Sequence, residues 1–260
     1  MSAIHPTAFV DPAAELGRDV TIEPYAVVEA HTVVGDGARI GPHAVVHAHA
    51  TVGPRTHLHA HAIVGGWPQD LAFDPATVST VVIGADCVLR EGVTVHRGTK
   101  SDSVTRLGDG CFLMANSHVA HNCTLGNQVI MANGALLGGY VEVQDQVFIS
   151  GNCVVHQFCR IGRLAMMSGL SAVSKDVPPF CVVENSSTNT VAGLNVVGMR
   201  RGGISAEERL AIKRVYGVVY HQDLNTEQAL QQLAKDPPQG PAAEMVAFIQ
   251  ASQRGICRHR

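Results

Sequence analysis

The most constraining feature of this sequence is an aliphatic residue that recurs every six positions. The series begins at Ile4 and continues unbroken to Val64. Its phase slips across GWPQDLAFDPATVSTV, resumes at Ile83 and, after the degenerate hexad SDSVTR, continues from Leu107 to Val173. Neither the helical period of 3.6 nor the simple alternation of a strand produces this spacing. A hexapeptide repeat is the signature of a parallel β-helix, which we therefore expect here.

Each hexad is expected to supply one short strand and one corner, with its aliphatic residue and its small fifth residue facing inward. Three hexads close one coil, and the roughly 26 hexads predict between eight and nine coils, stacked about 4.8 Å apart. Most of the cysteines fall in the inward fifth slot, where other hexads have small residues. These are Cys87, Cys111, Cys123, Cys153 and Cys159. We interpret them as buried thiols in a reducing compartment rather than as a disulfide or zinc framework.

The repeat also predicts the domain organisation. Pro178 and Pro179 should end the strand ladder, and Ser205 with Glu208 forms a capping box at the start of a helical pattern. These helices could cap the open end of the β-helix. We expect a β-helix over 1–179 with an inserted loop at about 66–82, a linker over 180–203 and a C-terminal α-helical domain over 204–260.

Charge and hydropathy limit the possible partners. The net charge of −3 argues against general nucleic-acid binding, although residues 200–260 carry 9 basic against 6 acidic side chains. This basic end could meet an acidic partner or a phosphate. No apolar run approaches the length of about 18 residues that crosses a bilayer, and MSAIHPTAFV does not resemble a signal peptide. We therefore expect a cytoplasmic protein without membrane insertion.

Positions 18 residues apart lie above one another in such a solenoid and form a column along its axis. His121 shares a column with Gly139 and Gln157. A neutral imidazole can act as a general base near pH 7. A backbone N–H at Gly139 could hold an oxyanion, and glycine there would not obstruct a substrate. The arrangement suits acyl transfer. A second column lies beside it and contains Asn122, Tyr140 and Phe158.

Other histidines fit a surface or an interface better than a catalytic site. The N-terminal set consists of His43, His47, His49, His57, His59 and His61. Of these, His43 and His61 share a column, and no carboxylate or thiolate accompanies them there. By contrast, His96, His118 and His156 lie within a few coils of His121.

Several motifs, in a fixed order, resemble one known family. They are PQDLAF, VHRGT, NSHVAHNCTLGN, LLGGYVEV, CVVHQF, SKDVPPF and GLNVVGMRRG. Together they resemble the UDP-N-acetylglucosamine O-acyltransferase family, which begins lipid A biosynthesis, over essentially the whole chain. The resemblance implies a left-handed β-helix homotrimer with active sites between neighbouring subunits. It also implies transfer of an (R)-3-hydroxyacyl group from acyl carrier protein to the 3-hydroxyl of UDP-N-acetylglucosamine, without metal or cofactor.

The resemblance also implies residue roles. His121 would be the general base and the Gly139 amide the oxyanion donor. Gly169 would be the position that sets acyl length, where the absence of side-chain bulk leaves room for a longer chain. The implied substrate-binding residues are Gln69 and Asp70 for the sugar, His118 and His156 lining the site, and Gln157, Asn195, Arg200 and Arg201 for the nucleotide. Arginine suits the last role because its guanidinium binds phosphate through two hydrogen bonds.

This sequence departs from the family pattern at several positions. Ala72 replaces a lysine, Tyr140 stands where a histidine is usual, and Asn122 replaces the aspartate after the catalytic histidine. An amide cannot give an imidazolium the electrostatic support of a carboxylate. NVVG lacks an acidic residue, and NSST lacks a histidine. The acyl length and the exact acceptor are left open by the sequence.

Three alternatives follow from the same residues. The nearest is an enzyme that acylates the amine of a related UDP-amino sugar. A hexapeptide-repeat carbonic anhydrase would use three histidines, here His96, His118 and His121, as zinc ligands at an intersubunit site. A noncatalytic trimeric scaffold would neither turn over substrate nor bind nucleotide.

Overall fold

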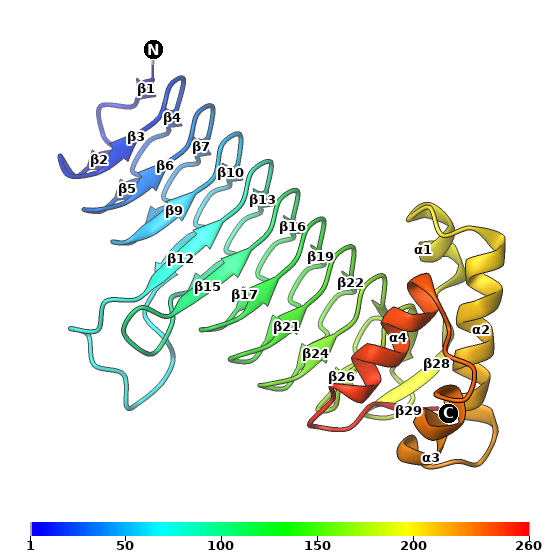
Figure 1. Ribbon diagram of the computed structural model, residues 1–260. Helices are drawn as coiled ribbons and strands as arrows, with labels where there is room; N and C mark the ends of the chain where they lie inside the picture. Colours follow the sequence, from blue (N-terminus) through cyan, green and yellow to red (C-terminus); the bar gives the residue numbers. More distant parts are fainter. Residues whose placement is uncertain (1, 260) are drawn as a thin grey trace.

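The computed structural model describes residues 2–259, which form a left-handed parallel β-helix with helices packed at its C-terminal end (Figure 1). The chain visits three sheets in turn, here called A, B and C, so that consecutive strands belong to different sheets. Ala3 pairs with Thr21 and Thr21 with Arg39, a register of one coil. The hexapeptide prediction of the fold is confirmed.

Most strands are only two residues long, as a six-residue repeat requires. Sheet A consists of β1 (Ala3–Ile4), β4 (Thr21–Ile22), β7 (Arg39–Ile40), β10 (His57–Leu58), β13 (Val88–Leu89), β16 (Phe112–Leu113), β19 (Ile130–Met131), β22 (Phe148–Ile149), β25 (Met166–Met167), β27 (Cys181–Glu184), β28 (Thr190–Leu194) and β29 (Arg258–His259). Sheet B consists of β2 (Phe9–Val10), β5 (Val27–Val28), β8 (Val45–Val46), β11 (Ile63–Gly66), β14 (Thr94–His96), β17 (His118–Val119), β20 (Leu136–Leu137), β23 (Val154–Val155) and β26 (Ala172–Val173). Sheet C consists of β3 (Glu15–Leu16), β6 (Val33–Val34), β9 (Ala50–Val52), β12 (Thr80–Ile83), β15 (Val104–Leu107), β18 (Thr124–Leu125), β21 (Glu142–Val143) and β24 (Arg160–Ile161).

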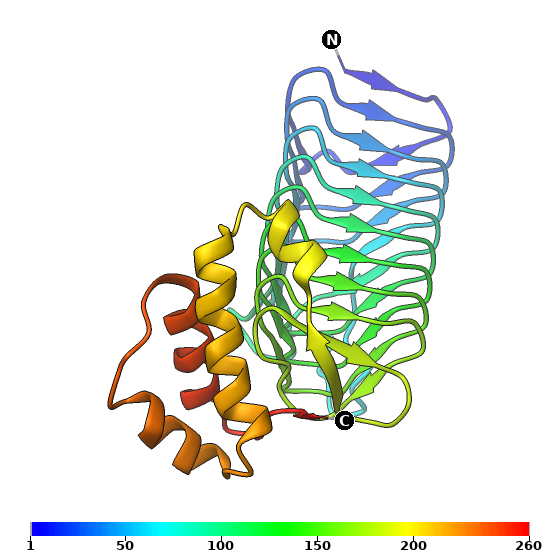
Figure 2. The same ribbon diagram turned by 90° about the vertical axis from the view of Figure 1, so that its right-hand side faces the viewer.

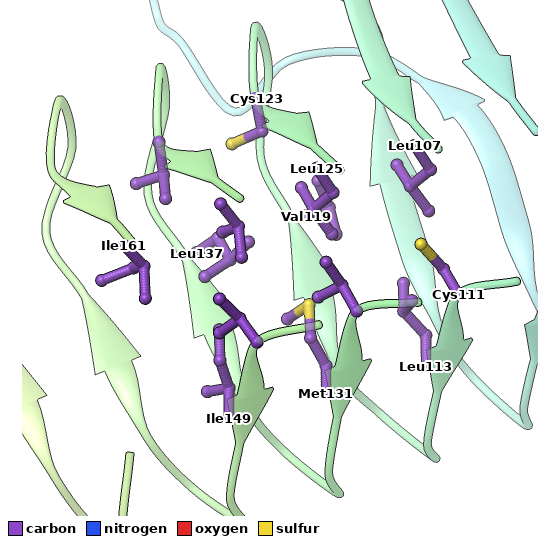
Figure 3. Close-up of a cluster of buried hydrophobic side chains, with 14 of the residues drawn as sticks. Leu107, Cys111, Leu113, Val119, Cys123, Leu125, Met131, Leu137, Ile149 and Ile161 are labelled. Carbon is purple, nitrogen blue, oxygen red and sulfur yellow. The ribbon is translucent and has the colours of Figure 1, made fainter. Parts of the chain in front are cut away.

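The core is the stack of aliphatic residues that set the period (Figure 3). Leu113, Met131 and Ile149 are fully buried on successive coils of sheet A. Ile4, in contrast, is 47% exposed because no coil covers the N-terminal end. The five fifth-slot cysteines are buried as expected, and the Cys123 thiol donates to the Gly138 carbonyl of the next coil at 3.1 Å.

Two loops interrupt the ladder, and both connect sheet B to sheet C. The first, 67–79, lies between β11 and β12 and was expected as an insertion. The second, 97–103, lies between β14 and β15, where the sequence suggested a degenerate hexad within the ladder. Val88 pairs with Phe112, so six additional residues of this coil leave the ladder as a loop. The expectation of a further rung there is corrected.

The three edges of the prism are named by the sheets that they join. Corner B/C contains the two loops and the short segments 120–123, 138–141 and 156–159. Corner C/A includes residues 162–165, between β24 and β25, and corner A/B includes residues 168–171, between β25 and β26. Residues in one corner lie one above another along the solenoid axis.

Strand pairing in sheet A continues beyond the two prolines, because β27 pairs in parallel with β25. β28 then returns antiparallel to β27 and leads into α1 (Val196–Arg201), so the segment expected as a linker contains regular elements. The other helices are α2 (Ala206–His221), α3 (Thr226–Leu233) and α4 (Gly240–Gln250). Ser205 and Glu208 form the predicted capping box at the start of α2.

The helices lie along the last coils of the solenoid (Figure 2). Arg163 of corner C/A forms an ion pair with Glu244 of α4 at 2.7 Å. The buried carboxylate of Asp176 accepts hydrogen bonds from the Arg160 N–H at 2.8 Å and the Ser252 hydroxyl at 2.7 Å, which ties the C-terminal segment to sheet C. Within residues 2–259 no helix is long and apolar enough to cross a membrane.

Candidate active site

His121 and Gly139 lie in direct contact at corner B/C, on adjacent coils. A Cβ atom added to Gly139 would lie 2.3 Å from Cε1 and 2.6 Å from Nε2 of the His121 ring. The imidazole therefore covers the glycine, which is itself buried. The sequence suggested that glycine leaves room for a substrate, whereas the space that its missing side chain provides is filled by His121.

Several main-chain N–H groups of this corner have no hydrogen-bond partner within residues 2–259, and that of Gly139 is one of them. Tyr140 N–H donates to the His121 carbonyl, and Phe158 N–H donates to the Gly139 carbonyl, both at 3.0 Å. The Gly139 N–H makes no hydrogen bond within residues 2–259. A free backbone donor beside an imidazole is the pairing that acyl transfer through a tetrahedral intermediate requires.

Two further histidines lie on the N-terminal side of His121 and are held in the neutral form. His118 Nδ1 and the Thr94 hydroxyl are hydrogen-bonded at 2.7 Å, and the rings of His96 and His118 meet edge to face at 4.7 Å. Burial lowers the pKa of His118, and the neighbouring His121 lowers it further. Burial, reinforced by His118 and His121, lowers the pKa of His96 to about 4. At neutral pH these two imidazoles therefore add little positive charge to the site.

The buried His96 predicts a pH-dependent stability. Its pKa of about 4 in the folded protein lies below the unfolded value of about 6.5, so the unfolded chain binds the proton first as pH falls. The contribution of neutral His96 to the free energy of unfolding is fully present above pH 6.5. As pH falls from 6.5 to 4, roughly 3 kcal/mol of that free energy is lost progressively. We expect His96→Gln to flatten the fall in unfolding free energy across that window, measured by urea denaturation. His31→Gln, at an exposed position, should not, and an unchanged pH slope in His96→Gln would contradict the assignment.

Asn122 connects His121 to the second loop. The Asn122 side-chain oxygen lies 3.0 Å from His121 Nδ1 and accepts hydrogen bonds from the Thr99 N–H and hydroxyl, each at 3.1 Å. The Thr99 hydroxyl also lies 3.1 Å from the Tyr140 hydroxyl. Tyr140 in turn stacks on Phe158 at 4.9 Å, so the second predicted column is an aromatic one. Sequence reasoning missed Thr99, which lies in the loop 97–103 just before the hexad SDSVTR.

The first loop carries Gln69 and Asp70 to the same corner, two coils before His121. Both residues are exposed, and Asp70 accepts a hydrogen bond from the Ala72 N–H at 2.9 Å within the loop. Arg97 holds the base of the loop: its guanidinium lies 5.4 Å above the Phe73 ring and donates to the Pro75 carbonyl at 3.3 Å. The loop is thus fixed against the coil that precedes His118.

A cleft of about 740 Å³ adjoins this corner on the C-terminal side. One wall consists of the second column, and the other consists of the C-terminal segment around Arg254. His156 and Gln157 are exposed beside it, and Arg254 reaches His156 Nδ1 at 3.4 Å. The corner therefore contains His121, Gly139, His156, Gln157 and the loop with Gln69 and Asp70, and His118 lies beside it in β17 of sheet B.

The other predicted residues lie elsewhere in the same chain. Asn195 caps α1 and donates to the Leu164 carbonyl at 2.8 Å, which places it at corner C/A with the exposed Arg200 and Arg201. Gly169 is at corner A/B, and a Cβ there would meet no atom nearer than 3.7 Å. One chain alone therefore does not bring Asn195, Arg200, Arg201 or Gly169 next to His121.

The carbonic anhydrase alternative requires three side chains that can bind one zinc ion. Within residues 2–259 no cluster of three or more His, Cys, Asp or Glu side chains is arranged to hold a metal ion. His118 Nδ1 is instead engaged with Thr94, and His121 Nδ1 with Asn122.

Comparison with known proteins agrees with this geometry. Residues 13–48, 31–66 and 105–139 match the bacterial transferase hexapeptide model, and residues 176–257 match a model described as UDP N-acetylglucosamine O-acyltransferase, domain 2. The fold, its repeat and the imidazole beside a free backbone donor define a hexapeptide-repeat acyltransferase.

Relatives identify the family within this class. A protein of Alkalilimnicola ehrlichii named acyl-(acyl-carrier-protein) UDP-N-acetylglucosamine O-acyltransferase is 50% identical over 99% of this chain and its own full length. One of Janthinobacterium sp. with the same name is 46% identical over 99% of this chain and its own full length. The crystal structure of the UDP-N-acetylglucosamine acyltransferase of Bacteroides fragilis superposes with a TM-score of 0.93 at 35% identity, covering 98% of this chain and 100% of the other. The chain belongs to the UDP-N-acetylglucosamine O-acyltransferase family, which removes the carbonic anhydrase and scaffold alternatives.

Proposed function

We propose that corner B/C carries out the reaction of this family. The chain transfers an acyl group from acyl carrier protein to UDP-N-acetylglucosamine, the first step of lipid A biosynthesis. The transferred group is an (R)-3-hydroxyacyl chain and the acceptor is the 3-hydroxyl of the sugar. The observation that carries the assignment of the site is the contact between the His121 ring and Gly139, whose N–H is free.

The chemical roles follow from that contact. His121 Nε2 removes the proton of the sugar hydroxyl as its oxygen attacks the thioester carbonyl carbon. The Gly139 N–H stabilises the oxyanion that forms on the carbonyl oxygen. When the intermediate collapses, the carbon–sulfur bond breaks and the proton returns from His121 to the departing thiolate. The neutral His118 and His96 support this cycle because they do not compete for that proton.

The substrate residues support a site shared between subunits. Gln69, Asp70, His118, His156 and Gln157 serve the sugar and the nucleotide from corner B/C. The proposed nucleotide residues Asn195, Arg200 and Arg201 belong to corner C/A of the same chain, on another edge of the prism. A neighbouring copy that places its corner C/A beside this corner B/C would complete the site. We therefore propose a homotrimer, in which each cleft is equivalent.

Mixed trimers test this arrangement. We expect His121→Ala and the double variant Asn195→Ala, Arg201→Ala each to be inactive alone. Mixed trimers isolated with two affinity tags should regain about a third of the parent activity, because one of the three interfaces in every mixed trimer pairs two intact halves. Mixing separately purified trimers without subunit exchange is the control. If mixed trimers stay as inactive as either parent, each site lies within one chain.

The remaining proposals concern the acyl chain and the partner protein. Gly169 has free space above its Cα, which supports a role as the position that limits acyl length. The basic surplus of residues 200–260 would attract the acidic acyl carrier protein. We further propose a cytoplasmic enzyme that needs no cofactor and binds no nucleic acid.

The acyl length can be measured directly. We expect the protein, incubated with UDP-N-acetylglucosamine and a series of (R)-3-hydroxyacyl carrier proteins, to give one O-acylated product, identified by mass. Gly169→Met should shift its preferred chain to a shorter one, since the side chain occupies the space above the glycine. Acylation of a UDP-amino sugar amine in preference to the 3-hydroxyl would overturn the proposed acceptor.

A further inference from the structure

Beside a catalytic histidine, the asparagine side chain of Asn122 differs from a carboxylate in one respect, because it has two different groups that can face the imidazole. Both oxygens of a carboxylate only accept hydrogen bonds, whereas a carboxamide can present either its oxygen or its NH₂ group to the imidazole. If the NH₂ group faced His121 Nδ1, that nitrogen would have to accept, and Nε2 would carry the proton instead of the basic lone pair. In a serine-protease triad, the change from Asp to Asn lowers kcat by about 10⁴-fold for this reason.

The Thr99 main chain resolves the ambiguity. Its N–H can only donate, and it points at the Asn122 side-chain atom 3.1 Å away, which must therefore be the oxygen. The same oxygen lies 3.0 Å from His121 Nδ1. Because an amide oxygen can only accept, Nδ1 must carry the hydrogen, and the lone pair remains on Nε2. Nε2 is also the ring nitrogen nearer to the space above Gly139.

Side-chain contacts support the same orientation. The Thr99 hydroxyl is 3.1 Å from the Asn122 oxygen and 3.1 Å from the Tyr140 hydroxyl. With the Thr99 hydrogen directed to Asn122, the Tyr140 hydroxyl donates to Thr99. The Asn122 main chain is fixed as well, since its N–H donates to the Thr105 hydroxyl at 2.7 Å. The asparagine is thus held from both its backbone and its side chain.

We propose that Thr99 is a positioning residue that fixes the orientation of the Asn122 amide and thereby selects the His121 tautomer with a basic Nε2. The loop 97–103 then has a catalytic purpose, because it carries this donor to corner B/C. Asn122 retains the orienting function of an aspartate without its charge. The inference rests on the proposed role of His121 as the general base, but the tautomer itself can be measured without turnover.

The test combines a spectroscopic and a kinetic measurement on the full-length protein. Nitrogen NMR of ¹⁵N-histidine-labelled protein, assigned by comparison with His121→Asn, should show His121 protonated at Nδ1 at neutral pH. Thr99→Pro removes the N–H and should produce the Nε2-protonated tautomer, with kcat lowered about 10²-fold or more. Thr99→Val keeps the N–H and should keep the Nδ1-protonated tautomer, with less than a tenfold change in kcat.

Rescue separates tautomer selection from general damage. Adding Asn122→Asp to Thr99→Pro should restore the tautomer and most of the activity, because a carboxylate needs no orienting donor. Parent protein with His121 protonated at Nε2, or a Thr99→Pro variant that is not rescued, would overturn the inference. If Thr99→Pro does not fold, the spectrum of the parent protein still tests the inference, because it shows which nitrogen of His121 carries the proton. A tautomer that responds while kcat does not would support the role of Thr99 and reject His121 as the base.

Discussion

Replacing His121 with alanine should lower kcat by about 10³-fold while leaving KM for UDP-N-acetylglucosamine nearly unchanged. Loss of a general base removes an interaction that operates in the transition state, and such losses range from about 10²- to 10⁴-fold. The ring is half-buried at a corner and is not part of the aliphatic core, so the coil should remain intact. Steady-state kinetics measures kcat and KM, and circular dichroism together with size-exclusion chromatography measures whether the coil remains intact.

Two comparisons make this result specific. His31→Ala removes another histidine from corner B/C, an exposed one far along the solenoid, and should leave kcat unchanged. Imidazole added to His121→Ala should recover part of the lost rate, because the space above Gly139 is vacated. A loss smaller than tenfold, or a loss that accompanies unfolding, would contradict the role of His121 as base.

The column of His121 and Gly139 could be predicted from the sequence because a solenoid turns sequence spacing into position. Once the period is six and three hexads close a coil, residues 18 apart must lie on adjacent rungs. The same rule correctly placed Tyr140 over Phe158 and the histidines His43 and His61, which stack at 5.0 Å. Outside the two coils that carry inserted loops, strand pairing between coils enforces this register, so no tertiary information was needed.

Where the period breaks, the prediction from sequence fails for a physical reason. The loop 97–103 is outside the ladder, and its shape depends on contacts such as that between Thr99 and Asn122, which no repeat encodes. The orientation of the Asn122 amide was equally hidden, because it depends on a backbone donor from another coil. Similarly, the sequence names Asn195 but cannot tell that it returns to corner C/A, beside Leu164.

Replacing Gly139 with alanine should have the second largest effect, a loss of about 10²-fold or more in kcat. The added methyl group would lie 2.3 Å from Cε1 of His121, closer than any real contact, so the imidazole must move. A base displaced from its working geometry by about 1 Å can lose roughly 10²-fold. The alanine leaves the backbone N–H in place, so the loss should arise from the position of the ring rather than from the oxyanion donor.

The matched control is Gly217→Ala in α2, where an added Cβ meets no atom within 4 Å. This variant should keep full activity, which would show that a glycine-to-alanine change alone is harmless. Because His121→Ala has no ring to displace, Gly139→Ala should cost it little further activity, and the two losses should be far from additive. Additive losses would mean that Gly139 acts independently of His121, for instance only through its N–H. The double variant therefore decides whether glycine is required here to seat the imidazole.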